Sequence, residues 1–362
     1  MGAPLNPGLL RADGSSPYRR LVGVGGIGTG LFFALEGDHD LGRNESRAAR
    51  LLDVRDYCKL HIVAHYPAVL LGAGFEVVPV GKVGDDEAGQ RLRAEMAAAG
   101  MDVRFVLTVA GRATLLSVCF QYPDGSGGNI TTSDSAAAGL TEADVERAAS
   151  LLDERTIALC VPEVPLGQRH HLLTAATQGR ALRVAALASA ELAEAKARGF
   201  FASVDLLALN EDEASALTGV PVGSGPPRPL LEACARLLTA AQPAIRLVVS
   251  AGPHGAFAFA GGHWEHSPAL KVKVASTAGA GDALLGGLLT ALAVGVPFTV
   301  AGPPRTALSD RPLASALDFG VLLSAFKVTS PHTIHPDARL ETLLTFAHQH
   351  GLAFAEPLRR HF

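Results

Sequence analysis

The sequence predicts an α/β protein in which a mostly parallel sheet carries helices on both faces, with a small sheet inserted near the beginning. Three observations predict this class. From about residue 140 onward, short apolar strands alternate with helical patterns. The chain of 362 residues is 48% apolar and only 18% charged, which suits a large core. Between Leu31 and Cys58, short apolar runs lack helical periodicity and indicate an inserted small-sheet segment.

The first half of the chain contains three expected strands, one helix and one hairpin. The strands are expected at 21–25, 75–80 and 103–108, and the helix at 86–99. Asp85 is expected to cap this helix, in which Ala88, Leu92 and Met96 recur at helical spacing. The hairpin is predicted because residues 113–122 and 129–132 flank a Pro-Asp-Gly turn at 123–125.

The second half follows a strand–helix–strand rhythm. Short apolar strands are expected at 157–161, 184–187, 206–209 and 247–249, with helical patterns between them. Such an order implies right-handed crossovers and a parallel sheet covered on both faces. Ligands of these sheets bind beyond the carboxyl ends of the strands. The loops that directly follow strands are therefore the places to search for a site.

Composition excludes several function classes. A net charge of −4 argues against nucleic acid as a partner, because phosphate binding needs a basic surface. The four widely spaced cysteines have no metal-type spacing and favour a reducing compartment, so we expect a cytoplasmic protein. Residues 1–20 are interpreted as a flexible leader. The uncharged stretch from Ala283 to Pro304 is interpreted as a buried helix ending near Gly295 and then a loop, so no membrane partner is expected.

The most informative segment is glycine-rich. Lys271–Val274 is expected to form a strand, followed by Ser-Thr-Ala-Gly-Ala-Gly-Asp at 276–282 and an apolar helix. Free N–H groups at the start of a helix, together with its dipole, suit a phosphate or a developing oxyanion. The dipole would keep Asp282 ionised, so that it could accept a proton from a substrate hydroxyl. The alternative is that Asp282 simply caps the helix and the glycines only make a tight turn.

Two other loops follow strands in the same region. Asn210 and Glu213 lie at the end of one strand, where an amide and a carboxylate could hold a hydrated magnesium ion against phosphates. They could equally form a helix N-cap with an acidic first turn. Ser250, Gly252 and Gly255 follow the next strand. Three such loops within about 160 residues indicate a nucleotide site.

In this order, these motifs resemble those of the ribokinase-like (PfkB) carbohydrate and nucleoside kinases. The resemblance runs from about Leu21 to Asp337 and rests on four segments, of which the last is the most specific: Gly81-Lys82-Val83-Gly84-Asp85-Asp86, Asn210-x-x-Glu213, Ser250-x-Gly252 and Thr277-Ala278-Gly279-Ala280-Gly281-Asp282. It implies a three-layer α/β/α doubly wound fold. A single kinase domain would span residues 21–356, with a small β-sheet lid built from about 31–58 and 112–133.

The resemblance also implies roles for single residues. Asp282 would be the base that deprotonates the acceptor hydroxyl, and the N–H groups of Gly279, Ala280 and Gly281 would form an anion hole for the γ-phosphate of ATP. Asn210 and Glu213 would organise Mg²⁺ and the phosphates, with Glu213 acting on the metal through water. The implied ATP site is lined by Ser250, Gly252, Gly255 and Thr277. The acceptor would be a small molecule with a hydroxyl group, and lid strands of such kinases often pair between subunits, which would make a homodimer.

The acceptor side departs from the family pattern. Gly30 stands near the position of a substrate-binding Asp, and Ser276 stands where the family usually has Asp. The usual Gly-Gly-x-x-x-Asn segment is replaced by Leu60–Tyr66, so His61 and His65 become candidate substrate contacts, together with Glu163 in a strand-end segment similar to that of these kinases. The chain is thus an atypical member on the acceptor-binding side.

Two alternatives to a kinase remain open. Gly23-x-Gly25-x-x-Gly28 matches the dinucleotide fingerprint and would make the protein an NAD-dependent oxidoreductase, but that motif needs a long helix directly after the glycines. The changed acceptor side instead motivates a protein of kinase fold that binds a nucleotide or metabolite without turnover.

Overall fold

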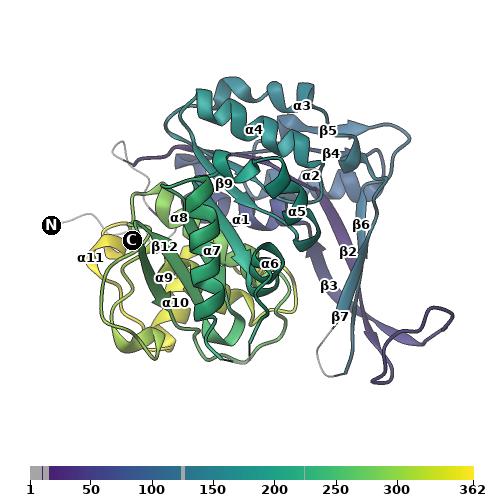
Figure 1. The fold of residues 1–362 in the computed structure, drawn as a ribbon. Coiled ribbons are helices and arrows are strands. Elements are labelled where there is room, and N and C mark those ends of the chain that lie inside the picture. The colour runs from purple at the N-terminus through teal and green to yellow at the C-terminus, as the bar shows by residue number, and fades with distance from the viewer. Residues whose placement is uncertain (1–9, 11–15, 124–126, 224) are drawn as a thin grey trace.

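The fold is built around a nine-stranded sheet with helices on both faces (Figure 1). The structure is a computed structural model and describes all residues except 1–9, 11–15, 124–126 and 224. The strand order is β13-β12-β11-β10-β9-β8-β1-β4-β5. All neighbours pair in parallel except β11–β12 and β12–β13, which are antiparallel. The predicted doubly wound, mostly parallel sheet is therefore confirmed.

The strands of the central sheet lie near the predicted positions. They are β1 (Arg20–Val24), β4 (Glu76–Gly84), β5 (Val106–Val109), β8 (Thr156–Cys160), β9 (Leu182–Ala186), β10 (Leu206–Asn210), β11 (Arg246–Ser250), β12 (Ala256–Ala260) and β13 (His263–Ser267). The predicted strand at Lys271–Val274 is wrong, because this segment pairs with no strand in the described part of the chain. The next two amides, of Ala275 and Ser276, both donate to the Val328 carbonyl.

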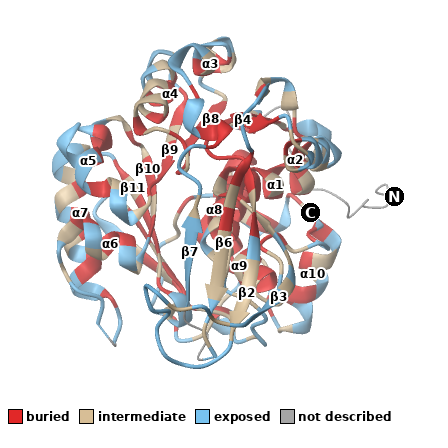
Figure 2. Ribbon diagram, turned by 90° about the vertical axis from the view of Figure 1, so that its right-hand side faces the viewer, coloured by how far each residue is buried: buried red, intermediate tan, exposed pale blue. Residues whose placement is uncertain are grey.

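Helices cover the two faces of the sheet in two separate cores. One core contains residues of α1 (Lys59–Leu71), α2 (Glu87–Ala98), α8 (Ala280–Ala293), α9 (Ala316–Lys327) and α10 (Leu340–Gln349). The other contains residues of α3 (Glu142–Glu146), α4 (Leu166–Gln178), α5 (Leu192–Ala197), α6 (Glu211–Thr218) and α7 (Arg228–Ala241). A short α11 (Glu356–Arg359) follows. Figure 2 shows the buried residues concentrated along the central strands and the inward faces of these helices.

Neighbouring strand residues alternate between the two cores, as the pleat requires. In β1, Leu21 belongs to the core of α1 and α8, whereas Val22 belongs to the core of α4 and α7. Helix α2 is capped by Asp86, whose carboxylate accepts the Gly89 N–H, and not by Asp85 as predicted. Asp86 also accepts the Thr114 N–H at 2.7 Å, whereas the Asp85 carboxylate accepts the Gly111 N–H at 3.2 Å.

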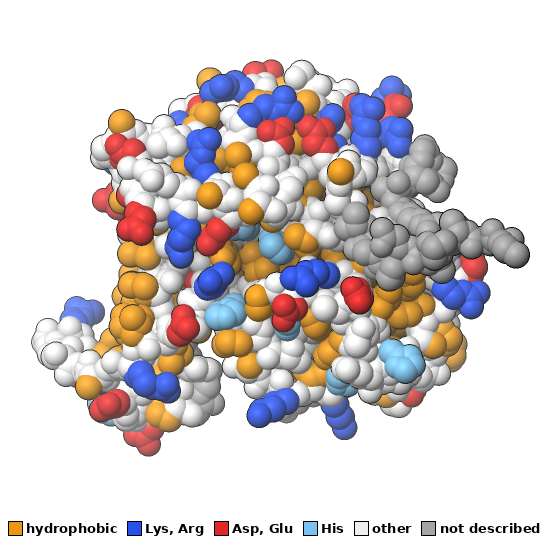
Figure 3. Space-filling view, turned by 180° about the vertical axis from the view of Figure 1, so that it is seen from behind, with side chains coloured by type: hydrophobic (Ala, Val, Ile, Leu, Met, Phe, Trp, Pro, Cys, Tyr) orange, Lys and Arg blue, Asp and Glu red, His pale blue; other side chains and the backbone are white. Residues whose placement is uncertain are grey.

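A second, four-stranded sheet stands beside the first, in the order β3-β2-β6-β7. Its strands are β2 (Gly28–Leu35), β3 (Ala49–Tyr57), β6 (Leu115–Gln121) and β7 (Gly127–Thr131). We call it the small sheet. It projects from the body, and hydrophobic side chains gather along it in the view from behind (Figures 1 and 3). The predicted β6–β7 hairpin pairs as expected, while most of its predicted turn, at 123–125, lies outside the described residues.

The small sheet also decides one alternative reading of the sequence. The third glycine of the dinucleotide-like motif, Gly28, begins strand β2 and not a helix. A dinucleotide fingerprint requires a helix whose N-terminus receives the pyrophosphate. The glycines at 23–28 therefore do not form such a motif.

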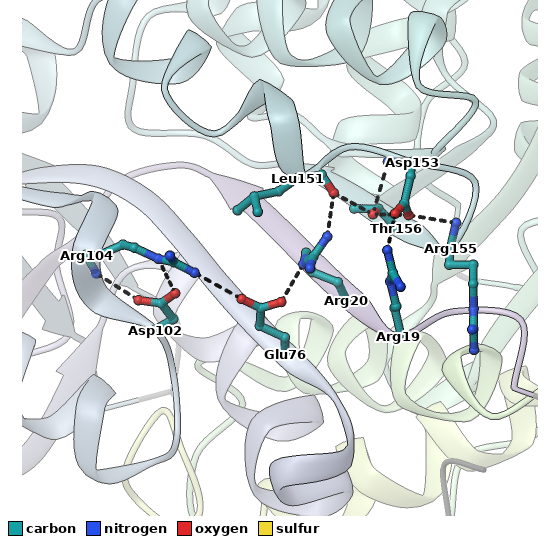
Figure 4. A network of polar contacts seen from close by, with 9 residues as sticks. All are labelled: Arg19, Arg20, Glu76, Asp102, Arg104, Leu151, Asp153, Arg155 and Thr156. Atoms are coloured by element: carbon teal, nitrogen blue, oxygen red, sulfur yellow. Dashed lines mark hydrogen bonds and ion pairs between the residues drawn. The ribbon is translucent and has the colours of Figure 1, made fainter. Parts of the chain in front are cut away.

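The amino-terminal edge of the central sheet is held by ion pairs (Figure 4). Arg20 at the start of β1 pairs with Glu76 at the start of β4 at 2.5 Å and donates to the Leu151 carbonyl. Arg19 pairs with Asp153. Within the predicted leader, Leu10 and Ser16 are buried, and these residues pack against the body instead of lying loose. The other residues of 1–15 lie outside the described part of the chain.

The long apolar stretch forms helix α8 and then a loop, as the sequence predicts. Eleven residues of this helix are buried, all of them after Asp282. Within the described part of the chain, no helix combines the length and the hydrophobicity needed to cross a membrane.

Candidate functional site

The predicted loops meet at the carboxyl edge of the central sheet. Asn210 and Ser250 end neighbouring parallel strands and lie in register with each other. The start of α8 lies against the same edge: the Ser250 Oγ is 3.8 Å from the position that a Cβ on Gly281 would occupy. Segments separated by about 70 residues in sequence therefore lie together at this edge.

The N-cap position of α8, Gly279, strongly favours glycine. Gly279 has φ +79° and ψ 2°, in the left-handed region. A Cβ there would also lie 2.5 Å from the Thr333 carbonyl oxygen. This backbone turn directs the first helical N–H groups toward the open end of the helix.

One member of the predicted anion hole is already engaged. The Ala280 N–H donates to the Thr277 carbonyl at 3.0 Å, so it is not available to a ligand in this geometry. The N–H groups of Gly279, Gly281 and Asp282 have no partner among the described residues. Gly281 is exposed and a side chain at its position would meet open space apart from Ser250. Of the predicted anion hole, the N–H groups of Gly279 and Gly281 are therefore open, together with that of Asp282, whereas the Ala280 N–H is engaged within the turn.

Asp282 lies in the first turn of α8, where opposing effects act on its pKa. Burial raises the pKa of this carboxyl, the Lys59 ammonium lowers it, Glu213 raises it again, and Lys327 lowers it. Burial thus opposes the helix dipole, which the sequence argument took to be decisive. A carboxylate with a raised pKa is a stronger base once it is ionised.

Asn210 and Glu213 form a reciprocal helix cap. The Asn210 Oδ1 accepts the Glu213 N–H at 2.7 Å, and the Glu213 Oε2 accepts the Asn210 N–H at 2.8 Å. The other carboxylate oxygen, Oε1, lies 3.4 Å from the Lys59 Nζ. The capping reading of this segment is therefore correct, and Glu213 is buried with both oxygens in use.

The remaining residues of the predicted ATP side differ in exposure. Gly252 and Thr277 are exposed, and Ser250 is half-buried at the sheet edge. Gly255 is buried, with φ +84°, and a Cβ there would lie 2.1 Å from the Ser267 carbonyl oxygen. Gly255 therefore makes the turn into β12 beneath the loop, while Gly252 lies on the loop surface.

Glu163 occupies a strained position next to the same charges. Its φ of +76° is rare for a residue with a side chain. Its Oε2 is buried without a hydrogen-bond partner among the described residues. Burial raises the pKa of Glu163 to about 7, while the Lys59 ammonium lowers it and Asp282 raises it. The carboxylate does have hydrogen bonds with Cys58 and with the Lys59 backbone, but a left-handed backbone and one unpartnered buried oxygen in the same residue are typical of functional positions.

His61 and His65 lie one turn apart on α1, inside the protein. Their ring contacts are with Tyr57, Tyr66 and each other, including a His61–Tyr57 centroid distance of 4.4 Å. Burial lowers the pKa of His61 to about 3 and that of His65 to about 4, so both are neutral at pH 7. Among the described residues, neither ring hydrogen-bonds or pairs with Asp282, Glu163 or Lys59. The structure therefore does not bring the two histidines into contact with these three charged groups.

Three charged residues near Asp282 were missed by the sequence argument: Asp56, Lys59 and Lys327. Lys327 is fully buried, and its Nζ donates to the Ser276 carbonyl at 3.0 Å. Asp56 lies across from Gly30 in the small sheet. Nothing in their spacing indicates a site, because each comes near Asp282 only through long-range packing.

No group of three or more His, Cys, Asp or Glu side chains in the described part of the chain could hold a metal ion. Glu213 is the predicted magnesium contact, acting through water, and both of its carboxylate oxygens contact protein groups.

The fold and the site together define an α/β protein with open backbone N–H groups at a helix N-terminus beside the carboxyl group of Asp282. The family model described as pfkB family carbohydrate kinase matches residues 64–339. This match covers more than half of the chain, so the protein belongs to the pfkB carbohydrate kinase family.

Solved structures share the fold at low sequence identity. Ribokinase from Giardia lamblia superposes with a TM-score of 0.70 and 15% identity, over 86% of this chain and 94% of that one. Ribokinase from Arabidopsis thaliana, complexed with ribose and ATP, gives 0.65 and 18%, over 91% and 98%. Ribokinase from Cryptococcus neoformans var. grubii serotype A, in complex with ADP, gives 0.63 and 20%, over 91% and 99%. The ribokinase-like fold predicted from the motifs is confirmed.

Proposed function

We propose that the protein is an ATP-dependent kinase that transfers the γ-phosphate to a hydroxyl of a small sugar, sugar derivative or nucleoside. The observation that carries this proposal is the tip of α8, where Asp282 lies beside N–H groups that have no hydrogen-bond partner in the described part of the protein. Family membership and neighbours with ATP or ADP bound support the same conclusion.

The reaction follows from the charges at this tip. Asp282 accepts the proton of the acceptor hydroxyl as the oxygen attacks the γ-phosphorus. The new O–P bond forms while the bond to the β-phosphate oxygen breaks, and ADP leaves with that electron pair. The N–H groups of Gly279, Gly281 and Asp282 stabilise the negative charge of the transferred group. Positioning and charge neutralisation are the main requirements of phosphoryl transfer.

The other groups have supporting roles in this proposal. Lys59 lowers the pKa of Asp282 against the effect of burial, which favours the ionised form, and is itself paired with Glu213. Ser250, Gly252 and Thr277 would contact ATP from the loops at the sheet edge. The small sheet would act as a lid that closes over the acceptor and excludes water.

Magnesium fits this site only in one manner. Because Glu213 has both oxygens engaged, it would act on Mg²⁺ through water, and the ATP phosphates would supply most of the inner ligands. Bound Mg²⁺ would neutralise phosphate charge and orient the γ-phosphate.

The proposal is tested by Asp282→Asn, with Asp212→Asn as the control. Asp212 is an exposed carboxylate in the first turn of another helix, α6. Purified proteins are incubated with Mg-ATP and a panel of sugars, polyols and nucleosides, and ADP formation is measured. We expect Asp282→Asn to lower turnover by about 100- to 10,000-fold, with folding and ATP affinity nearly unchanged, and the control to match wild type.

Two results would contradict the proposal. Wild-type turnover in Asp282→Asn would remove Asp282 as the base. ATP binding without ADP formation by the wild type over the whole panel would instead support a non-catalytic nucleotide-binding protein of the same fold.

A further inference from the structure

We propose that Asp56 of the small sheet is the carboxylate that holds the acceptor beside Asp282, and that the acceptor is an uncharged or cationic polyhydroxy compound. This inference rests on the proposed kinase function and names its substrate class. Asp56 takes the place of Gly30 as the proposed acceptor contact from the small sheet.

The first argument is the contact between Asp56 and Gly30. The two residues pair across the antiparallel strands β2 and β3. A Cβ on Gly30 would lie 2.1 Å from the Asp56 Oδ2 and 3.0 Å from its Cγ. No side chain can therefore stand at position 30 while Asp56 keeps this place. The glycine leaves a space over β2, and the carboxylate of the neighbouring strand fills it.

The second argument links Asp56 to the tip of α8 through Thr333. The Thr333 Oγ1 accepts the N–H of Tyr57, the residue after Asp56, at 3.0 Å. The Thr333 carbonyl is the atom that a Cβ on Gly279 would meet at 2.5 Å. One residue thus contacts both the end of β3 and the first residue of the helix tip. Asp56 is thereby fixed near Asp282, and the two carboxylates act on each other electrostatically.

The third argument is the protonation state of Asp56. Burial raises the pKa of its carboxyl to about 6, hydrogen bonds from Thr333 and the Tyr57 backbone hold it down, Asp282 raises it, and Lys327 lowers it. Asp56 is therefore ionised near pH 7.5 and is a hydrogen-bond acceptor only. Such a group binds hydroxyl or ammonium donors and repels carboxylates and phosphates.

The surrounding charges exclude an anionic acceptor for the same reason. Three carboxyl groups lie near one another here, because Asp282 raises the pKa of both Asp56 and Glu163. Of the two ammonium groups, Lys59 is paired with Glu213 and Lys327 is fully buried against the Ser276 carbonyl. Each ammonium group therefore already has a protein partner, and the two do not offset the carboxyl groups that an anionic acceptor would meet. Hydroxyl groups next to the one that is phosphorylated would donate to Asp56.

The inference is tested with Asp56→Asn and with Asp53→Asn as a matched control. Asp53 is on the same strand but exposed. The acceptors are xylitol, D-fructose and adenosine as neutral compounds, glucosamine as a cationic one, and fructose 6-phosphate and gluconate as anionic ones. Initial rates of ADP formation give KM for acceptor and for ATP, and thermal unfolding checks the fold of each variant.

We expect turnover of neutral or cationic acceptors only. Asp56→Asn should raise the acceptor KM by about 10- to 100-fold, because a hydrogen bond to a charged group is lost, while the KM for ATP stays unchanged. Asp53→Asn should behave as wild type. Gly30→Ala, which displaces the Asp56 carboxylate without removing it, should reproduce the rise in acceptor KM.

Results that contradict the role of Asp56 differ from results that contradict the kinase function. A wild-type acceptor KM in Asp56→Asn, or preferred turnover of an anionic acceptor, overturns the inference and leaves the kinase function intact. If the wild type forms no ADP with any acceptor, the proposed function fails, and calorimetric binding of the same compounds decides the inference alone. Binding of a neutral or cationic compound that Asp56→Asn abolishes would uphold it, whereas absent or unaffected binding would overturn it.

Discussion

Alanine substitutions at two glycines of the α8 tip, Gly279 and Gly281, should have opposite effects on stability. Gly279 has φ +79°, and its Cβ would lie 2.5 Å from the Thr333 carbonyl oxygen. Gly281 is helical, and its nearest neighbour for a Cβ is the Ser250 Oγ at 3.8 Å, an ordinary contact. The two positions are separated by one residue, so the comparison isolates local backbone geometry.

The magnitudes follow from these contacts. An alanine in the left-handed region costs about 1 to 2 kcal/mol, and displacing Thr333 adds about 1 to 3 kcal/mol. Gly279→Ala should therefore lower the free energy of unfolding by about 2 to 5 kcal/mol. Gly281→Ala should raise it by about 0.5 to 1 kcal/mol, because alanine favours the helical state over glycine.

Urea unfolding of the ligand-free variants measures both values. Kinase activity should fall in both, because a methyl group on Gly281 projects at the exposed tip where phosphate is proposed to bind. Gly281→Ala alone is thus expected to be more stable than wild type and yet less active. Equal stabilities of the two variants, or Gly281→Ala as the less stable one, would refute the geometric reasoning.

Two further predictions concern pH. His65 has a folded pKa of about 4 against an ordinary 6.5, so the unfolded state binds more protons between these values and stability falls as the pH drops through this window. Over pH 6.5 to 4, urea unfolding should show wild type losing about 3 kcal/mol more than His65→Leu, and parallel curves would contradict this. The Lys327 ammonium lowers the pKa of Asp282, so Lys327→Met should move the acid limb of the pH–rate profile of kcat/KM to higher pH. An unmoved limb, or one at lower pH, would show that Lys327 does not act on the base.

Much of the architecture could be predicted because local patterns carry it. The parallel strands are short apolar runs followed by glycine or polar residues, and the helix after Asp282 is uncharged throughout. The hairpin of β12 and β13 was not predicted, and Lys271–Val274 was wrongly expected to be a strand. Alternation in these segments is weak, so pairing with a neighbour decides between strand and loop.

The site could be predicted only on the side where its residues are close in sequence. Gly279, Gly281 and Asp282 lie within four positions, and their chemistry follows from the helix tip. The engaged Ala280 N–H depends on the exact turn geometry, which spacing does not reveal. Asp56 and Lys327 are separated from Asp282 by long stretches of chain, and their approach depends on how the small sheet and α9 pack.

The contacts of the 331–335 loop with β3 limit how this protein can associate with itself. Strand β3 is an edge of the small sheet, and an unpaired edge can add a strand from a second molecule. Here the Arg55 N–H donates to the His332 Nδ1, the Arg55 carbonyl accepts the Thr333 N–H, and Tyr57 is held by Thr333. The backbone groups at the carboxyl end of β3 are therefore already hydrogen-bonded within the same chain. A dimer formed through the small sheet must therefore use the earlier part of β3, the β7 side or the face of the sheet.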